Sequence, residues 1–495
     1  MNKNYFNYLL KTRRVPILFF FAVYIGIMMV TGLNAHAEPD RGIELIVAAG
    51  MSATLTFALP VLMFSPVHAR KSADVFMALP ISRREMRITS LLFSFAVSYG
   101  FYFLGSVLLW AISGHTTIHI QTLCFSLIFM AFGLAVLLLF NSLLFLIANN
   151  LFDGVVMIAA YLCMPLMIFL AEVTTVGTLW AGYTSSSWYS GRALYLSPVY
   201  MVMENLVGII RRVQPYNVFS WNFVIALVIF GILSEIGLRK EFDERKTERA
   251  EQLSDGIFAY PLVINVYALI SLLVFAVQVL LDPREVSTLL LYLILLLIYV
   301  VASFVYKRSV KLEKKTLLVF VGEVLLSIAM VFGAWNTHFF GLADHYKLDR
   351  GPYLWYEYSA FTSVDDLGEE ENPGYDREGE VSEWMEVDVT ICIPVDQLEQ
   401  YREVIDMMDR VRVQAIDDFY ENPIQMYTNN NLRVFNSNEV DHYKPINYNS
   451  YRIHELLSEE ELKVLNRYAP VVVSHAKGWE YAPSMKLEEY LETKQ

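Results

Sequence analysis

Long apolar runs separated by short polar breaks dominate this sequence between Val15 and Trp335. A helix needs roughly 20 consecutive, mostly apolar residues to cross the hydrocarbon core of a bilayer. The runs therefore predict a polytopic α-helical membrane protein with about nine transmembrane helices. The predicted spans are residues 15–33, 44–64, 88–112, 121–148, 154–171, 219–238, 262–281, 286–306 and 316–335.

The charged residues are divided unevenly between the apolar part and the C-terminal region. Residues 336–495 carry 32 acidic and 14 basic side chains, whereas the rest of the chain carries 19 acidic and 24 basic ones. The acidic region has no basic stripe that would suit a nucleic acid, so we expect no nucleic-acid partner. The three cysteines, Cys124, Cys163 and Cys392, give no disulfide framework and no zinc site.

The C-terminal region has patterns of both strands and helices, which predict an acidic α+β soluble domain. Alternation of apolar and polar residues predicts strands at 386–394, 411–419 and 471–474, and helical spacing predicts helices at 396–411 and 458–468. The acidic segment Asp365–Asp376 matches no calcium-loop spacing, so a solvated loop is favoured over a cation site. We expect no metal, no cofactor and no catalytic residues in this chain.

Loop charges predict how the spans are oriented. Nineteen lysine and arginine side chains fall in the N-terminal segment and in the loops after the second, sixth and eighth spans, against five in the loops on the other side. Cytoplasmic loops of membrane proteins carry an excess of these cations. The N-terminus is therefore predicted to be cytoplasmic. Nine spans then make the acidic domain extracytoplasmic, in a multi-pass protein of the plasma membrane.

Two segments have the pattern of helices at a membrane surface. Residues 2–14 place apolar side chains among basic ones, which predicts an amphipathic helix on the inner surface, with a disordered basic leader as the alternative. Ser197 followed by Pro198 is a good start for a helix. The apolar spacing after it predicts a short helix that dips into the outer leaflet or lies on the protein surface.

The loop from Ser65 to Arg87 reads SPVHARKSADVFMALPISRREMR. Proline fixes φ and lacks an N–H donor, so a short helix is predicted to end before Pro80. Ser82 can then cap the following helix, with Glu85 three residues later as its capping-box partner. The short helix is predicted to lie parallel to the membrane and to bind a protein partner. The alternative is an ordinary proline-capped basic loop.

This loop resembles the coupling loop of ABC transporter permeases of the export-type class. The matching residues are Asp74, Leu79, Pro80, Ile81, Ser82 and Arg83, with Phe76 and Arg84 in the same predicted contact surface. A second stretch, after the sixth span, resembles the basic Arg-Lys-x-Glu-x-Ala exit of that family. Its matching residues are Phe242, Arg245, Lys246, Glu248 and Ala250.

The resemblance covers about residues 1–250 and implies a six-helix permease core there. Residues 251–335, with three additional spans, and the extracytoplasmic domain at 336–495 depart from the minimal family pattern. The family also implies two partners, namely a separate ATPase subunit that receives the loop and a second permease chain, as a homodimer or heterodimer. The chain has no GxxxxGK(S/T) phosphate loop, so ATP hydrolysis would belong to the other subunit.

Among the polar residues that fall inside predicted spans, where such groups are costly, are Asn141, Asn265, Glu235 and Glu323. Asn141 and Asn265 are uncharged and can bridge neighbouring helices. Glu235 lies near the inner end of the sixth span, and Glu323 lies about a third of the way into the ninth. For Glu323, a hydrogen bond to a neighbouring helix is favoured over a role in a transport pathway or in coupling.

Three functions compete at this point. The first is the permease subunit of an ATP-driven transporter, which the resemblance above implies to be of the export type. The second is a membrane sensor whose outer domain binds a ligand, although its cytoplasmic side offers only short loops and no output domain. The third is a polytopic membrane enzyme, for which no catalytic motif such as GxSxG is present.

Overall fold

The computed structural model describes most of the chain. The described residues are 2–37, 42–113, 118–181, 192–210, 220–254, 256–281, 286–342, 353–363, 384–394, 399–421, 431–436, 446–449 and 471–475. They form two compact units. The first unit comprises Met1–Leu170, Gly191–Ile270 and Leu295–Phe320, and the second comprises Ala171–Ser190, Ser271–Ile294 and Val321–Gln495. The predicted domain boundaries after residues 250 and 335 stay predictions.

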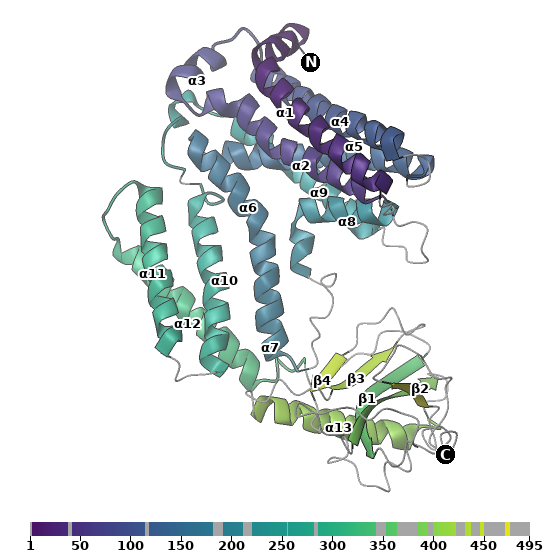
Figure 1. The fold of residues 1–495 in the computed structure, drawn as a ribbon. Coiled ribbons are helices and arrows are strands. Elements are labelled where there is room, and N and C mark those ends of the chain that lie inside the picture. Colours follow the sequence, from purple (N-terminus) through teal and green to yellow (C-terminus); the bar gives the residue numbers. More distant parts are fainter. Residues whose placement is uncertain are drawn as a thin grey trace. The chain divides into compact units, whose positions relative to one another are not determined.

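Nine helices within the described residues are long and apolar enough to cross a bilayer, which confirms the prediction of a polytopic helical protein (Figure 1). Each of them covers one of the nine predicted spans. They are α1 (Lys3–Ala37), α2 (Ile43–Phe64), α4 (Arg83–Ser113), α5 (Ile120–Ile147), α6 (Leu151–Ala171), α9 (Trp221–Leu238), α10 (Tyr260–Leu281), α11 (Val286–Lys307) and α12 (Lys314–Asn336).

The core of the first unit is built by α1, α2, α4, α5 and α9 together with a short helix, α8 (Pro198–Ile210). The predicted helix after Ser197 is thus confirmed, and the N–H of Tyr200 donates to Ser197 Oγ at 3.3 Å. Helix α8 approaches α5 closely at Gly133, where an added Cβ would lie 2.9 Å from Val202 Cγ1. Close packing of this kind is typical of small residues at helix interfaces in membranes.

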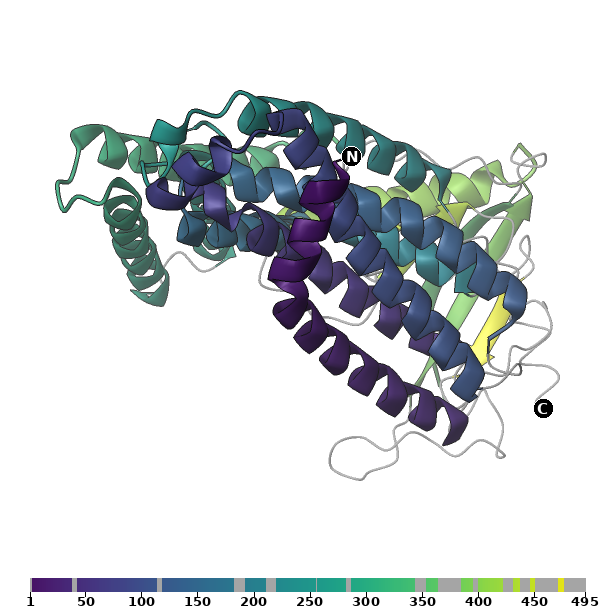
Figure 2. The same ribbon diagram turned by 90° about the horizontal axis from the view of Figure 1, so that it is seen from above.

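The N-terminal segment is helical and continuous with the first span. Helix α1 contains Pro16, and Figure 2 shows that it changes direction after its first turns. Proline removes one backbone hydrogen bond and favours such a bend. The first turns pack on the unit through Tyr5 and Leu9, which are buried. The prediction of an amphipathic helix is therefore confirmed against the alternative of a disordered leader, although protein covers part of its apolar face.

In the second unit, aromatic rings connect the end of α12 to a helix much later in the chain. Helix α13 (Arg402–Glu421) places the ring of Tyr420 4.9 Å from Trp335 and 4.6 Å from His338, measured between centroids. The hydroxyl of Tyr420 also donates to the carbonyl of Leu179 at 2.9 Å. Leu179 ends α7 (Gly177–Leu179), which continues α6 through a π turn, η2 (Glu172–Val176).

The described strands form one antiparallel sheet with the order β4-β3-β1-β2-β5. They are β1 (Tyr353–Ser363), β2 (Trp384–Pro394), β3 (Asn431–Asn436), β4 (Ile446–Asn449) and β5 (Val471–His475). The strands predicted at 386–394 and 471–474 correspond to β2 and β5. The strand predicted at 411–419 is wrong, because α13 continues through these residues. The helix predicted at 458–468 and the acidic segment 365–376 lie outside the described residues.

Candidate functional site

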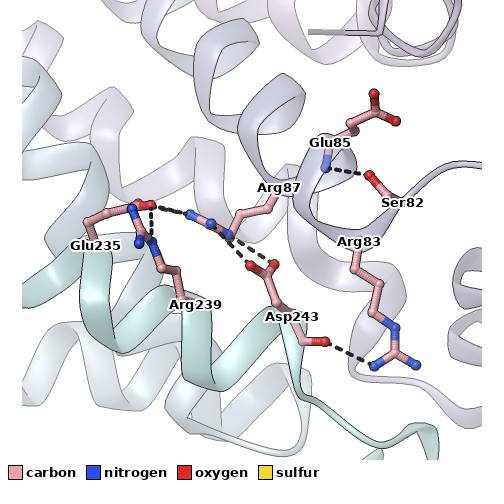
Figure 3. A network of polar contacts seen from close by, with 7 residues as sticks. All are labelled: Ser82, Arg83, Glu85, Arg87, Glu235, Arg239 and Asp243. Atoms are coloured by element: carbon pink, nitrogen blue, oxygen red, sulfur yellow. Dashed lines mark hydrogen bonds and ion pairs between the residues drawn. The ribbon is translucent and has the colours of Figure 1, made fainter.

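The loop segment, residues 65–87, folds as two short helices that lead into α4. These helices are η1 (Ser65–Val67) and α3 (Arg70–Met77). Helix α3 ends before Pro80, and the N–H of Glu85 donates to Ser82 Oγ at 3.3 Å at the start of α4 (Figure 3). The predicted short helix, proline break and serine cap are therefore confirmed.

The two faces of α3 have different surroundings. Phe76 is only 9 % exposed, and its ring lies 6.4 Å from that of Tyr5, between centroids. The expectation that Phe76 is presented to a partner is therefore wrong, because the first turns of α1 cover it. The exposed face consists of Lys71, Asp74, Val75 and Ala78, which are spaced as neighbours on one side of a helix.

The other predicted contact residues of the loop segment differ in exposure. Pro80, Ser82 and Arg84 are exposed, whereas Leu79 and Ile81 are half-buried against the core of the first unit. Among the apolar side chains, Val75 is the most accessible one of the loop, with 70 % of its surface exposed. An apolar contact with a partner would therefore centre on Val75 rather than on Leu79.

The exit segment, residues 239–254, follows α9 and carries the second predicted motif. It begins with a π turn, η4 (Arg239–Asp243), and contains a short 3-10 helix, η5 (Thr247–Arg249). Phe242 is fully buried, with its ring centroid 5.4 Å from that of Phe64. Lys246 and Glu248 are exposed. The segment is thus anchored through Phe242, while Lys246 and Glu248 lie at the surface.

A buried arginine joins α4 to the exit segment. The guanidinium of Arg87 donates to both carboxylate oxygens of Asp243 at 3.1 Å and to Glu235 at 2.8 Å (Figure 3). Arg87 itself is only 1 % exposed. Glu235 also accepts from Arg239 at 3.1 Å. A buried cation of this kind is stable only with its anionic partners in place, so these contacts fix the start of α4 against the end of α9.

The π turn η4 explains how both carboxylates reach the same guanidinium. Residues eight apart on an ideal α-helix point roughly 80° away from each other, because each residue rotates by about 100°. A π turn holds more residues per turn and shifts the register at this point. Glu235 and Asp243 are therefore brought towards one face, which is the face that Arg87 occupies.

Arg83 brings the two predicted motifs into direct contact. Its Nη1 donates to the backbone carbonyls of Arg245 at 2.7 Å and of Asp243 at 3.2 Å. These motifs are about 160 residues apart in sequence and were identified separately. Because Arg83 is engaged within the chain, only Arg84 of this basic pair is free to point outward, and it is exposed.

The last turn of α5 is capped by two residues from these segments. Arg245 is 1 % exposed and donates to the carbonyls of Leu146 at 2.7 Å and Ala148 at 3.0 Å. His68 lies with Nε2 3.1 Å from the carbonyl of Phe145. Carbonyls at a helix C-terminus lack partners within the helix, and a cation is favourable there. Loop segment and exit segment therefore meet at the end of α5.

The protonation of the two capping residues follows from their surroundings. Burial, together with the nearby Arg245 guanidinium, lowers the pKa of His68 to about 4. Burial lowers the pKa of Arg245 to about 10. At neutral pH the pair is therefore a neutral imidazole beside a guanidinium that keeps its charge.

The four polar residues singled out inside the predicted spans behave differently. Asn141 Nδ2 donates to Thr56 Oγ1 at 3.1 Å and so bridges α5 and α2, and Asn265 Oδ1 accepts from the hydroxyl of Tyr299 of α11 at 2.8 Å. Both bridges agree with expectation. Glu235 belongs to the arginine network. Glu323 is half-buried in α12, and within the described residues its Oε2 has no hydrogen-bond partner. The predicted bond of this carboxyl group to a neighbouring helix stays a prediction.

Two residues of the site, Arg87 and Asp243, were not identified from the sequence. Arg87 was counted only as one of many basic loop residues. A signal was present, because Arg87 lies one turn after Arg83 at the edge of a span and therefore needs an acidic partner. Its partners are 148 and 156 residues away, and no local pattern connects them.

Comparison with known proteins adds no identification. No family model, no curated protein and no solved structure matches the chain. Within the part of the chain that the structure describes, no group of three or more His, Cys, Asp or Glu side chains is placed to hold a metal ion.

Proposed function

We propose that this chain is the transmembrane permease subunit of an ATP-binding cassette transporter of the export type in the plasma membrane. A separate ATPase subunit would bind the loop segment on the cytoplasmic side, and a second permease chain would complete the complex. The C-terminal region, with its sheet and α13, would be a water-soluble α+β domain outside the cell.

One observation carries this proposal. The loop segment and the exit segment, which resemble two separate motifs of the permease family, lie against each other through Arg83 and Arg87. An ordinary basic flank needs no such contacts, because its cations can remain in water. A loop that transmits force to the spans does need them. Movement of α3 would act on α4 through a rigid proline turn and on α9 through Arg87.

The exposed face of α3 supports a protein as the partner. It combines one apolar side chain, Val75, with the opposite charges of Lys71 and Asp74. Apolar contacts at the centre of an interface carry most of the affinity, whereas charges at its rim mainly affect the rate of association. Val75 is therefore the residue whose change tests the contact without disturbing the interior.

The substitution Val75→Asp should abolish binding of the ATPase. Loss of a central apolar contact costs about 2 kcal/mol or more, so recovery of the complex should fall at least about 30-fold. The measurement is the amount of a P-loop ATPase that co-purifies with the tagged chain from membranes of its own host in mild detergent.

The matched control is Val310→Asp, the same change at a residue that is 84 % exposed between α11 and α12. This variant should co-purify the ATPase at the wild-type level. If the wild-type chain brings down no ATPase, or if Val75→Asp brings down as much as Val310→Asp, the assignment of the loop segment as an ATPase contact is wrong.

The proposed orientation makes a second prediction, on accessibility from the two sides of the membrane. In a variant lacking Cys124, Cys163 and Cys392, a cysteine at Val310 should react with a membrane-impermeant maleimide only after the cells are opened. A cysteine at Val413 in α13 should react in intact cells, because α13 would lie outside. Labelling of Val413→Cys only in opened cells would place the C-terminal region in the cytoplasm.

A further inference from the structure

Glu251, near the end of the exit segment, has an unusual backbone conformation. Its φ is +63°, in the left-handed region that residues other than glycine rarely adopt. Such a conformation costs roughly 1–2 kcal/mol and persists only when the surrounding contacts impose it. The contacts of Glu251 therefore show what holds this part of the chain in place.

Three polar groups of Glu251 contact three different parts of the first unit. Its Oε1 accepts from the N–H of Arg70 at 3.2 Å, at the start of α3. Its own N–H donates to the carbonyl of Asn149, between α5 and α6, at 2.9 Å. Its carbonyl accepts from Nη1 of Arg308 at 3.2 Å, in the turn 308–313 between α11 and α12. Three segments that are distant in sequence thus meet at one residue.

Arg308 is strained in the same way. Its φ is +48°, again in the left-handed region. Its Nη2 also lies 4.0 Å from Oδ2 of Asp153, at the start of α6. Asp153 in turn accepts from the hydroxyls of Tyr260, in the first turn of α10, at 2.9 Å and of Ser254 at 3.1 Å. The turn 308–313 is therefore joined to the exit segment through the bond from Arg308 to Glu251. The start of α10 is joined to it through Asp153, which accepts from both Tyr260 and Ser254.

The contacts between Glu251 and Arg308 lie at the surface of the first unit. Glu251 and Arg308 are exposed, so each bond is worth only about 1 kcal/mol or less. Together these bonds impose the left-handed backbone of both residues and form a joint that holds the start of α3, the exit segment and the turn 308–313 in one arrangement. The six-helix part alone does not need the joint, because Arg87 and Arg245 already fix the exit segment to α4 and α5.

We propose that Glu251 and Arg308 form a mechanical link that transmits movement of the loop segment to helices α10, α11 and α12. The inference rests on the proposed function, since the ATPase would supply the movement. The additional spans would then move together with the six-helix core when the ATPase moves the loop segment. In the reverse direction, a change in these spans would alter the position of α3.

The link can be tested first in the chain alone. Nitroxide labels at Ala69→Cys and Val310→Cys, in full-length protein lacking its three native cysteines and reconstituted in lipid nanodiscs, report the distance between α3 and the turn. Ala69 is exposed at the N-cap of α3, outside the face proposed to contact the ATPase. The wild-type distribution should be narrow. Arg308→Gln, which cuts the turn side, and Glu251→Ala, which cuts the loop side, should each broaden it about twofold.

Two variants serve as matched controls. Glu251→Gln keeps an acceptor oxygen for the N–H of Arg70 and should retain the wild-type width. Lys315→Gln removes an exposed cation at the start of α12 and leaves all three contacts of Glu251 unchanged. Equal widths in the wild type, Arg308→Gln and Glu251→Ala would overturn the link, as would equal broadening in Lys315→Gln.

The second measurement adds ATP and vanadate to the complex with its co-purified ATPase. In the wild type the two labels should move together and keep their distance, whereas in Arg308→Gln the distance should change because only α3 moves. A distance that changes equally in both proteins would overturn the link but leave the permease assignment intact. Failure of any ATPase to co-purify would instead refute the proposed function, and the measurement on the chain alone would still decide the link.

Discussion

The molecule joins distant helices in two places, and the chemistry of the two joints differs. In the first unit, Arg87 of α4 binds Glu235 and Asp243 at the end of α9, with distances of 2.8–3.1 Å. In the second unit, Tyr420 of α13 packs its ring against Trp335, in the last turn of α12, and against His338, just after that helix. The first joint is built from charges, and the second from aromatic surface.

The difference predicts how each joint responds to damage. A buried cation with two carboxylates is stable only when the set is complete, because removal of one member leaves the others unpaired. Aromatic contacts lose energy in proportion to the surface removed, with a small addition for each hydrogen bond. The charged joint should therefore fail abruptly, as a coupling element would, and the aromatic joint should weaken gradually.

Arg87→Ala should have the largest effect on stability. It leaves Asp243 without its cation and Glu235 with only the exposed Arg239, at a cost of about 4 kcal/mol in the free energy of unfolding. The measurement is unfolding of the purified protein in detergent, followed by circular dichroism. Arg84→Ala, which removes an exposed arginine three residues earlier, should change the stability by less than about 0.5 kcal/mol. Similar effects of the two substitutions would show that the charged joint is not cooperative.

His68 should make the stability of the first unit depend on pH. Its pKa of about 4 in the folded protein lies below the ordinary value of 6.5, so the unfolded chain takes up the proton first as the pH falls. The stability it contributes is complete above pH 6.5 and is lost as the pH falls from 6.5 to 4. The loss should approach about 3 kcal/mol.

The same unfolding measurement on His68→Gln separates this effect from the titration of carboxylates. The variant lacks the imidazole, so its stability should fall less steeply between pH 6.5 and 4 than that of the wild type. Parallel curves for the two proteins would mean that His68 does not titrate abnormally.

Tyr420 provides the smallest expected effects and tests the gradual response. Tyr420→Ala should destabilise the second unit by about 2 kcal/mol, since it removes a half-buried ring. Tyr420→Phe keeps the ring and loses the bond that the hydroxyl donates to the carbonyl of Leu179 and the longer one that it accepts from the N–H of Ala181, at a cost of about 1 kcal/mol. The rate at which a protease cleaves α13 under native conditions should be lowest in the wild type, higher in Tyr420→Phe and highest in Tyr420→Ala. Equal loss from both substitutions would show that the hydroxyl, not the ring, holds this joint.

Much of the helical architecture could be predicted from local patterns. The nine spans, the short helix before Pro80 and the cap at Ser82 each follow from properties of adjacent residues. The prediction for Phe76 failed because periodicity identifies an apolar face but not the element that covers it. The first turns of α1, seventy residues earlier, occupy that face. Similarly, the strand predicted at 411–419 failed because the preceding helix simply continues.

The sequence alone located the nine helices that, within the described residues, are long and apolar enough to cross a bilayer, because hydropathy over a window of about 20 residues is a local property. It also located both basic motifs. Only the tertiary structure placed the motifs in contact and identified Arg87, Asp243 and the strained residue Glu251 as the groups that connect them. Contacts between residues about 60 to 180 positions apart depend on how helices pack, and no spacing along the chain encodes which partners meet.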